Sequence, residues 1–179
     1  MIYSTNYLSP IGLIKLASDG KFLNGLWMEG QKYFGGIISE KMTEKNNILI
    51  FDQTKDWLDR YFAQKRPSIS ELPLAPNGGE FRQGVWEILC QIPYGKVITY
   101  GDIAKQMALK MNKTKMSAQA VGGAVGHNPI SIIIPCHRVV GTNGSLTGYA
   151  GGIQKKIWLL SHEGVSMEGL TVPKKGTAL

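Results

Sequence analysis

The spacing of hydrophobic residues predicts a β-hairpin and a helix in the first third of the chain. Apolar-rich runs at 11–17 and 22–28 flank residues 18–21, SDGK, whose glycine supplies the positive φ that a tight turn needs. Between 47 and about 63, apolar residues recur at helical spacing, and Asn47 is the predicted N-cap. We therefore expect a small sheet accompanied by one helix.

The second half of the chain predicts mainly short helices. Apolar residues recur every fourth position from Phe81, and this helix is predicted to stop at PYGK, 93–96. Two further short helices are expected at 100–108 and 118–128, each preceded by a hydroxyl residue that can cap it. Because a turn in a basic region joins these two, they are compatible with a helix-turn-helix.

A segment rich in proline and glycine separates the two parts. Residues 66–79 contain three prolines and two glycines without periodicity, which is typical of a linker. We place a boundary near Asn77 and predict two small domains, 1–77 and 78–165. A tail, 166–179, follows, and its sequence VPKKG indicates flexibility. The expected fold class is α+β, with a sheet-and-helix domain first and a mostly helical domain second.

The positive charge of the chain is concentrated in the second part. The 179 residues carry a net charge of +7, and 80–165 alone hold nine Lys+Arg against four Asp+Glu, a net of +5. The densest cluster is Lys105, Lys110, Lys113 and Lys115, with no acidic residue between them. This asymmetry fits a polyanion as partner, but a solvated, lysine-rich loop would look the same.

The predicted helix at 118–128 has almost no side-chain bulk. Its glycines each cost about 0.5–1 kcal/mol relative to alanine, so some interaction must offset them. Close approach of another surface and tight packing against the protein's own core are both compatible with this composition. Gln119 is the main side chain that this helix offers to base edges, so we do not expect sequence-specific reading of DNA.

Cys136 is the strongest candidate for chemistry. A mostly apolar run, ISIII at 130–134, predicts a strand that ends at Pro135 and presents Cys136 and His137. Cys136 alone would fit a small buried hydrophobe equally well. Neighbours in an extended chain point to opposite faces, so either the chain turns here or His137 acts through a water. Some such activation is required, because the thiolate is the nucleophile.

Glu163 is the candidate third member of this group. Apolar residues from Ile153 to Leu160 predict a last helix, which ends at SHEG, 161–164. At that helix end Glu163 can accept a hydrogen bond from the far nitrogen of His137, although a surface carboxylate is the usual fate of a glutamate. Cys90 is expected to be inert core, and His127 and His162 are expected to be solvated turn residues.

Composition excludes several classes of protein. The 43% hydrophobic content suffices for a core, and 18% charged residues are too few for a disordered polyelectrolyte. Two cysteines cannot form a disulfide framework or a four-cysteine metal site. No apolar run reaches the roughly 18 residues that span a bilayer, and no secretory signal is present. We expect a soluble, cytoplasmic protein without membrane contact, metal or cofactor.

The sequence IPCHRV, 134–139, resembles the active-site signature of the O6-alkylguanine-DNA alkyltransferases, the methylated-DNA–protein-cysteine methyltransferases. Further segments resemble this family in the same order: 98–100, 120–124, 128–129, 148–152 and 158–164. The resemblance thus covers most of 80–164. In 1–79 it is weaker, although SPIG followed by a hairpin resembles the bacterial members. It implies a ribonuclease H-like first domain and a winged-helix-like helix-turn-helix in the second.

The resemblance also implies roles for individual residues. Cys136 would be the alkyl acceptor, His137 its base through a bound water, and Glu163 the group that orients His137. Asn128 would brace the adjacent turn, and Tyr100 would contact the target nucleotide's phosphate and help protonate the leaving guanine. The base pocket would be walled by Val139, Tyr149, Ala150 and Gly151.

The implied partner is double-stranded DNA containing O6-alkylguanine, bound through its minor groove with the target base flipped out. The implied contacts are Thr99, Gly101, Ser117, Ala118, Gln119, Ala120, Gly122, Gly123, Arg138 and Thr142. Transfer to a thiol would leave a stable thioether, so each monomer would act once. O4-alkylthymine is a second candidate substrate.

Two departures from the family pattern stand out. Gln119 occupies the position where the family often has an arginine, so we expect weaker DNA affinity or slower flipping. The lysine-rich segment before it is longer than usual, and Lys110, Lys113 and Lys115 are expected to contact backbone phosphates.

Some members bind zinc in the first domain, but no Cys precedes Cys90 and no His precedes His127, so no such site is expected.

Three other functions compete with alkyl transfer. A non-catalytic relative that only binds alkylated DNA would lack the acceptor thiol, whereas Cys136 is present. A transcription regulator would be expected to carry a separate regulatory domain or additional metal-site cysteines. A cysteine hydrolase would need an oxyanion-hole motif, and none is recognisable in the sequence.

Overall fold

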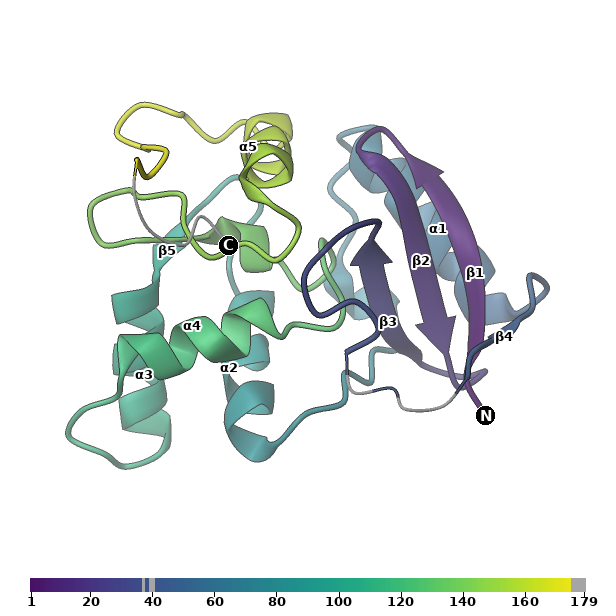
Figure 1. Ribbon diagram of the computed structural model, residues 1–179, viewed down its shortest axis with the longest axis horizontal. Coiled ribbons are helices and arrows are strands. Elements are labelled where there is room, and N and C mark those ends of the chain that lie inside the picture. The colour runs from purple at the N-terminus through teal and green to yellow at the C-terminus, as the bar shows by residue number, and fades with distance from the viewer. Residues whose placement is uncertain (37, 39–40, 175–179) are drawn as a thin grey trace.

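A computed structural model describes residues 1–36, 38 and 41–174 of the chain. The first part is a four-stranded sheet in the order β3-β2-β1-β4 (Figure 1). Its strands are β1 (Tyr3–Ser9), β2 (Gly12–Ser18), β3 (Leu23–Met28) and β4 (Thr43–Glu44). The first three pair antiparallel, and β4 runs parallel to β1. The predicted hairpin is therefore confirmed as β2 and β3.

Strand β1 was absent from the prediction. Its polar positions Ser4, Thr5 and Asn6 hide the alternation expected of a strand, yet Ser4 and Thr5 are buried. It turns directly into β2, with Ser9 paired to Gly12, whose φ is +109°. The sheet thus contains one more hairpin than the apolar pattern indicates.

Helix α1 (Leu49–Phe62) packs against this sheet, behind it in Figure 1. Its buried residues fall on one face: Ile50, Phe51, Thr54, Trp57, Leu58 and Tyr61. The predicted N-cap is wrong, because Ile48 takes that position and makes no side-chain capping bond. Asn46, which precedes the predicted cap, does not cap the helix either. Its Oδ1 accepts a hydrogen bond from Thr5 Oγ1 of β1 at 2.6 Å.

The segment predicted as a linker is ordered and packs along the first domain. Leu74 forms a parallel bridge with Leu23. The Leu23 amide donates to Pro73 O, and the Leu23 carbonyl accepts from the Ala75 amide. A short 3₁₀ turn, Ile69–Glu71, is closed by a capping box between Ser68 and Glu71. The segment therefore connects the two parts while adding to the edge beside β3.

The second part contains the predicted helices. They are α2 (Glu80–Cys90), α3 (Tyr100–Lys110), α4 (Ala118–Gly126) and α5 (Ile153–His162). Both expected caps are confirmed: Thr99 Oγ1 accepts from the amide of Asp102, and Ser117 Oγ accepts from the amide of Ala120. A short parallel pair, β5 (Ile98–Thr99) and β6 (Val139–Val140), completes this part.

The apolar run at 130–134 is a buried turn, so the predicted strand is wrong. Only Ile130 makes a β-bridge, to Leu26, and the amide of Ile134 donates back to the carbonyl of Ile130 at 3.0 Å. The Asn128 amide holds the turn, because Oδ1 accepts from Ile130 N at 3.0 Å and Nδ2 donates to Ile134 O at 2.8 Å. A short, mostly apolar run indicates burial, but it does not distinguish a strand from a buried turn.

The beginning of the expected tail is also packed. Thr171 exchanges backbone hydrogen bonds with Gly144 and Leu146. Met167 and Leu170 pack against a small buried cluster formed by Val140, Leu146 and Leu160. Of the segment predicted to be flexible, 175 and 176 lie outside the described residues.

One hydrophobic core includes residues of both parts. The Trp86 indole, for example, is 2% exposed and donates to the carbonyl of Ala124 at 2.9 Å, which joins α2 to α4. Among the described residues, no helix is both long and apolar enough to cross a membrane.

Removing core volume in α1 should destabilise the protein. Leu58 is fully buried, so we expect Leu58→Ala to lower the free energy of unfolding by about 2–5 kcal/mol. Leu49 lies on the same helix and is 71% exposed, so Leu49→Ala should change it by only about 0.5 kcal/mol. Chemical denaturation measures both, and equal losses would contradict the assigned orientation of α1.

Candidate active site

The chain makes a turn at Cys136, so Cys136 and its neighbour His137 can both belong to one site. Pro135 precedes a 3₁₀ turn, Cys136–Arg138, which leads directly into β6. The Cys136 amide donates to Ile134 O at 2.8 Å, so the turn continues from the one that Asn128 braces. Cys136 and His137 therefore do not alternate across a strand, and both are buried.

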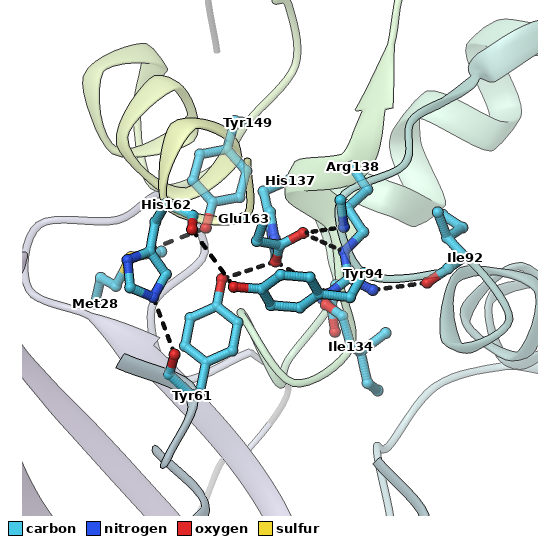
Figure 2. A network of polar contacts seen from close by, with 12 residues as sticks. Met28, Tyr61, Ile92, Tyr94, Ile134, His137, Arg138, Tyr149, His162 and Glu163 are labelled. Atoms are coloured by element: carbon cyan, nitrogen blue, oxygen red, sulfur yellow. Dashed lines mark hydrogen bonds and ion pairs between the residues drawn. The ribbon is translucent and has the colours of Figure 1, made fainter. Parts of the chain in front are cut away.

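Glu163 is the centre of a buried polar network, shown in Figure 2. It is 3% exposed, so the surface-carboxylate alternative is excluded. Its Oε1 accepts from His137 Nε2 at 2.6 Å, Tyr61 Oη at 2.8 Å and Arg138 Nη2 at 3.0 Å. Its Oε2 accepts from Arg138 Nε at 2.8 Å and Gly95 N at 3.2 Å.

These donors determine the charge of the carboxyl group. Burial raises the pKa of Glu163, but the hydrogen bonds and charges of His137 and Arg138 outweigh burial and hold that pKa well below its ordinary value. Glu163 is therefore a carboxylate at neutral pH. Burial also lowers the pKa of His137, against the opposing effect of Glu163, so its ring is neutral in the resting protein.

The position of the His137 proton follows from this pairing. Nε2 faces the carboxylate and must carry the proton, which leaves Nδ1 as the acceptor of the neutral ring. Nδ1 is buried and has no hydrogen-bond partner among the described residues. The free lone pair of His137 is thus available to take up a proton, as a base requires.

The Cys136 thiol is a protonated group in the resting state. Burial raises its pKa, while a hydrogen bond from Asn128 and the positive charge of Lys156 act in the opposite direction. Lys156 is itself fully buried, and its Nζ donates to Thr147 O at 2.9 Å and Val139 O at 2.5 Å. A thiolate formed here would therefore face a buried cation.

A cavity of about 690 Å³ is connected to this centre through Thr147, which lines the cavity and whose carbonyl accepts from Lys156. Cys136 and His137 are not among the residues that line it. Tyr100 lines it, with its hydroxyl donating to Thr147 O at 3.0 Å. A Cβ at Gly148 would collide with that hydroxyl, and Gly148 has a φ of +79°, so the wall requires glycine here. Of the expected wall residues, Ala150 lines the cavity, whereas Val139 and Tyr149 are buried and Gly151 packs beside Met28 and Tyr149.

Helix α4 presents its glycines to this cavity and not to the core. A Cβ added at Gly123 would meet no atom within 4 Å, and at Gly122 or Gly126 it would only reach ring atoms of Tyr100 or Tyr33 at 4.0 Å. Tight packing against the protein's own core therefore does not explain these glycines. Gln119 lines the same cavity, and Ser117, Ala118 and Ala120 are exposed beside it.

Three predictions are wrong, those for Arg138, His162 and His127, the last of which was expected, like His162, to be solvated. Arg138, expected at the DNA surface, is 6% exposed, pairs with Glu163 and donates to Ile92 O at 2.6 Å, so it belongs to the buried network. His162 is half-buried and not solvated: Nε2 lies 2.9 Å from Tyr61 O, and its ring stacks on Trp158.

His127 and the remaining predicted residues are placed as follows. Thr99 caps α3 beside Gly101, and Thr142 is exposed in the loop after β6. His127 is half-buried, stacks on Tyr33 and lies with Nδ1 2.7 Å from Gly123 O. Cys90 is half-buried, and burial raises its pKa to about 11.

Tyr61 and Lys156 also belong to the site, although neither was predicted from the sequence to be a site residue. Lys156 lies on the inward face of α5, three residues after Ile153 and four before Leu160, so the helical pattern could have revealed its burial. Tyr61 fits the apolar face of α1, but its partner Glu163 lies 102 residues away, and no local pattern indicates that pairing.

Within the described part of the chain, no three His, Cys, Asp or Glu side chains form a group that could hold a metal ion.

The pH dependence of stability should reveal the buried Glu163. Because its folded pKa lies below the unfolded one, the unfolded chain binds an extra proton between them, so stability rises with pH in that window. His137, whose pKa is also lowered, acts in the same direction below its ordinary value of 6.5. We expect the free energy of unfolding to fall between about pH 7 and pH 4.

Glu163→Gln should remove part of this slope. It should also cost about 3–5 kcal/mol at neutral pH, because Arg138 loses its buried counter-charge. Glu168→Gln, an exposed change, is the control and should alter neither quantity. Chemical denaturation across this pH range measures both, and parallel curves for wild type and Glu163→Gln would contradict the assigned charge.

Two family models match the chain. The ribonuclease-like domain of 6-O-methylguanine DNA methyltransferase matches residues 2–76, and the DNA binding domain of that family matches residues 80–165. The methylated-DNA–protein-cysteine methyltransferase of Haemophilus influenzae is 39% identical over 162 residues, covering 90% of this chain and 86% of the relative. That of Methanosarcina acetivorans is 41% identical over 168 residues, covering 91% and 99%.

Solved structures resemble the chain over the same extent. The O6-methylguanine methyltransferase of Mycobacterium tuberculosis has a TM-score of 0.77 at 40% identity, covering 91% of this chain and 93% of that one. A structure of the Mycobacterium tuberculosis protein in complex with DNA has a TM-score of 0.75, covering 90% and 91%. These relatives exceed 30% identity across nearly the whole chain, so the chain belongs to the methylated-DNA–protein-cysteine methyltransferase family.

Proposed function

We propose that this protein repairs DNA by transferring the O6-alkyl group of a damaged guanine to Cys136. The observation that carries the proposal is the buried thiol of Cys136, adjacent in the chain to His137 of the His137–Glu163 pair, together with a cavity under the glycine face of α4 that Thr147 and Tyr100 connect to this site. A nucleophile, its base and a place for a flipped base thus occur together. Membership of the family supports the same reaction.

The proposed transfer is a displacement at the alkyl carbon. The thiol proton of Cys136 passes through a water to Nδ1 of His137, and Glu163 stabilises the imidazolium that forms. Sγ attacks the alkyl carbon, the carbon–O6 bond breaks, and its electron pair stays on the guanine. The guanine takes up one proton from Tyr100, and the proton that left the thiol returns to the phenol through solvent, so the products are S-alkyl-Cys136 and intact guanine, and protons and charge balance.

We propose that Tyr100 assists the departure of guanine. Burial raises the pKa of its phenol above the ordinary value, so the hydroxyl remains protonated and can donate. It now donates to Thr147 O at the cavity wall, and a bound guanine would compete for that proton. The thioether formed on Cys136 has no easy leaving path, so each molecule acts once.

We further propose that α4 enters the minor groove of duplex DNA and that the damaged base flips into the cavity. The side-chain-poor surface of α4, with Ala118, Ala120 and Gly123 exposed and Gly122 half-buried, allows close approach without reading sequence. Thr99, Gly101, Ser117, Gln119 and Thr142 remain the proposed neighbouring contacts. We place the functional domains at 1–77 and 78–165 and expect a cytoplasmic monomer.

The lysine cluster fits this proposal only in part. Lys110 forms an ion pair with Glu87, and Lys105 lies 3.8 Å from Asp102, so these two are partly neutralised by neighbours. Lys113 and Lys115 are exposed and remain the proposed phosphate contacts of this segment.

Intact-protein mass measurement tests the reaction. After incubation with duplex DNA containing O6-methylguanine, we expect one methyl adduct per protein, on Cys136. Cys136→Ala should give none, whereas Cys90→Ala, which removes the other thiol, should react at a similar rate. Absence of an adduct, or release of many product equivalents per protein, would reject single-turnover transfer.

Gln119→Arg tests whether the base-flipping position limits this chain. Gln119 lines the cavity, and an arginine there would add a cation beside the DNA. We expect the variant to bind damaged duplex roughly 3- to 10-fold more tightly or to react faster, within the range of one added charged contact. Gln119→Glu is the opposite control and should weaken binding. Unchanged binding and rate in Gln119→Arg would show that this position is not limiting.

A further inference from the structure

A loop of the first domain reaches the mouth of the cavity. In Figure 1 the dark blue segment after β3 extends toward the C-terminal end of α4. The Lys32 amide donates to Ala150 O at 2.9 Å, which ties this loop to the cavity wall. Lys32 and Tyr33 line the cavity together with Tyr100 and Gln119. The cavity proposed to receive the base is therefore built by both domains.

Tyr33 is held in an unusual position at this junction. Its φ is +58°, a conformation that non-glycine residues seldom adopt and that often marks functional loops. Its ring is 43% exposed and stacks on His127 at 3.8 Å between centroids, directly after α4. The Lys32 ammonium lies 5.1 Å from the centroid of the same ring. Tyr33 thus holds a cation beside the end of α4.

A second cavity, of about 280 Å³, shares the Tyr33–His127 pair with the first. It is also lined by Asn77 and Arg82, so one cation borders each cavity. Within the described residues, neither Lys32 nor Arg82 forms an ion pair. Cations without a counter-charge on a continuous surface attract the phosphate backbone of duplex DNA.

We propose that the DNA-contact surface continues from α4 across the Tyr33 loop of the first domain to the start of α2, and that Lys32 in this loop and Arg82 in α2 bind backbone phosphates of the strand that carries the damaged nucleotide. This inference rests on the proposed function, because it takes DNA as the occupant of the first cavity. The Tyr33–His127 stack sets the spacing of the two cations and keeps the loop against the end of α4. The first domain is thus part of the DNA-binding surface.

The salt dependence of DNA binding tests this assignment. Binding to duplex containing O6-methylguanine is measured over a series of KCl concentrations in the Cys136→Ala background, which separates binding from transfer. Each phosphate contact contributes roughly one unit to the slope of log affinity against log salt. We expect Lys32→Ala and Arg82→Ala each to flatten the slope by about that amount, and the double variant by about two.

Lys45→Ala is the matched control. Lys45 belongs to the first domain and lies 4.9 Å from the ring of Tyr3, at the β1–β4 edge away from α4. The Lys45→Ala substitution removes one positive charge from a cation–aromatic pair, Lys45–Tyr3, that resembles the Lys32–Tyr33 pair. Because this pair lies away from α4, the salt slope should stay at the wild-type value. Equal slopes in all variants, or equal flattening by Lys45→Ala, would overturn the inference.

A second measurement separates this inference from the proposed function. In proteins that retain Cys136, the ratio of the alkylation rate with DNA to the rate with free O6-benzylguanine should fall several-fold in Lys32→Ala and Tyr33→Leu. A wild-type protein that forms no adduct would reject the function, whatever the binding slopes. An adduct in the wild type with unchanged slopes and ratios in the variants would reject only the extended surface.

Discussion

The buried carboxylate of Glu163 is the group on which both the fold and the site depend. An ion buried at this depth is tolerated only if donors surround it, and it receives five hydrogen bonds. These come from α1, the turn after α2 and the turn that carries Cys136. The Glu163 carboxylate therefore both joins α1 of the first domain to the second domain and fixes the tautomer of His137. A change that removes this charge should affect the domain contact and the His137 tautomer together.

The charges around Cys136 also explain how a reactive thiol is kept unreactive until a substrate arrives. Burial favours the protonated thiol, whereas Lys156 and the free nitrogen of His137 favour its deprotonation. Lys156 shares the Thr147 carbonyl with the Tyr100 hydroxyl, so cation, proton donor and cavity wall are connected through one backbone oxygen. The site thus combines a protected resting state with groups arranged for displacement.

Helix α4 shows how the protein keeps one surface free of side chains. Glycines at 122, 123 and 126 leave space where a helix would usually carry side chains, at a cost in helix stability. Trp86 and the buried residues Val121, Ala124 and Val125 secure the opposite face of α4 in the core. The helix can therefore present bare backbone to a partner while remaining fixed to the protein.

The sequence by itself determined the elements whose signals are local. Helical spacing, the caps Thr99 and Ser117, the β2–β3 turn and the IPCHRV motif all depend on residues close together in the chain, and each predicted its element or its family. Tertiary structure decided what depends on distant partners. It closed 130–134 into a turn around Asn128, buried Arg138, and paired Tyr61 with a carboxylate 102 residues away. Apolar periodicity predicts that a residue is buried, because it depends only on neighbours in the chain. Which distant residues it contacts is decided by the packing of the tertiary structure.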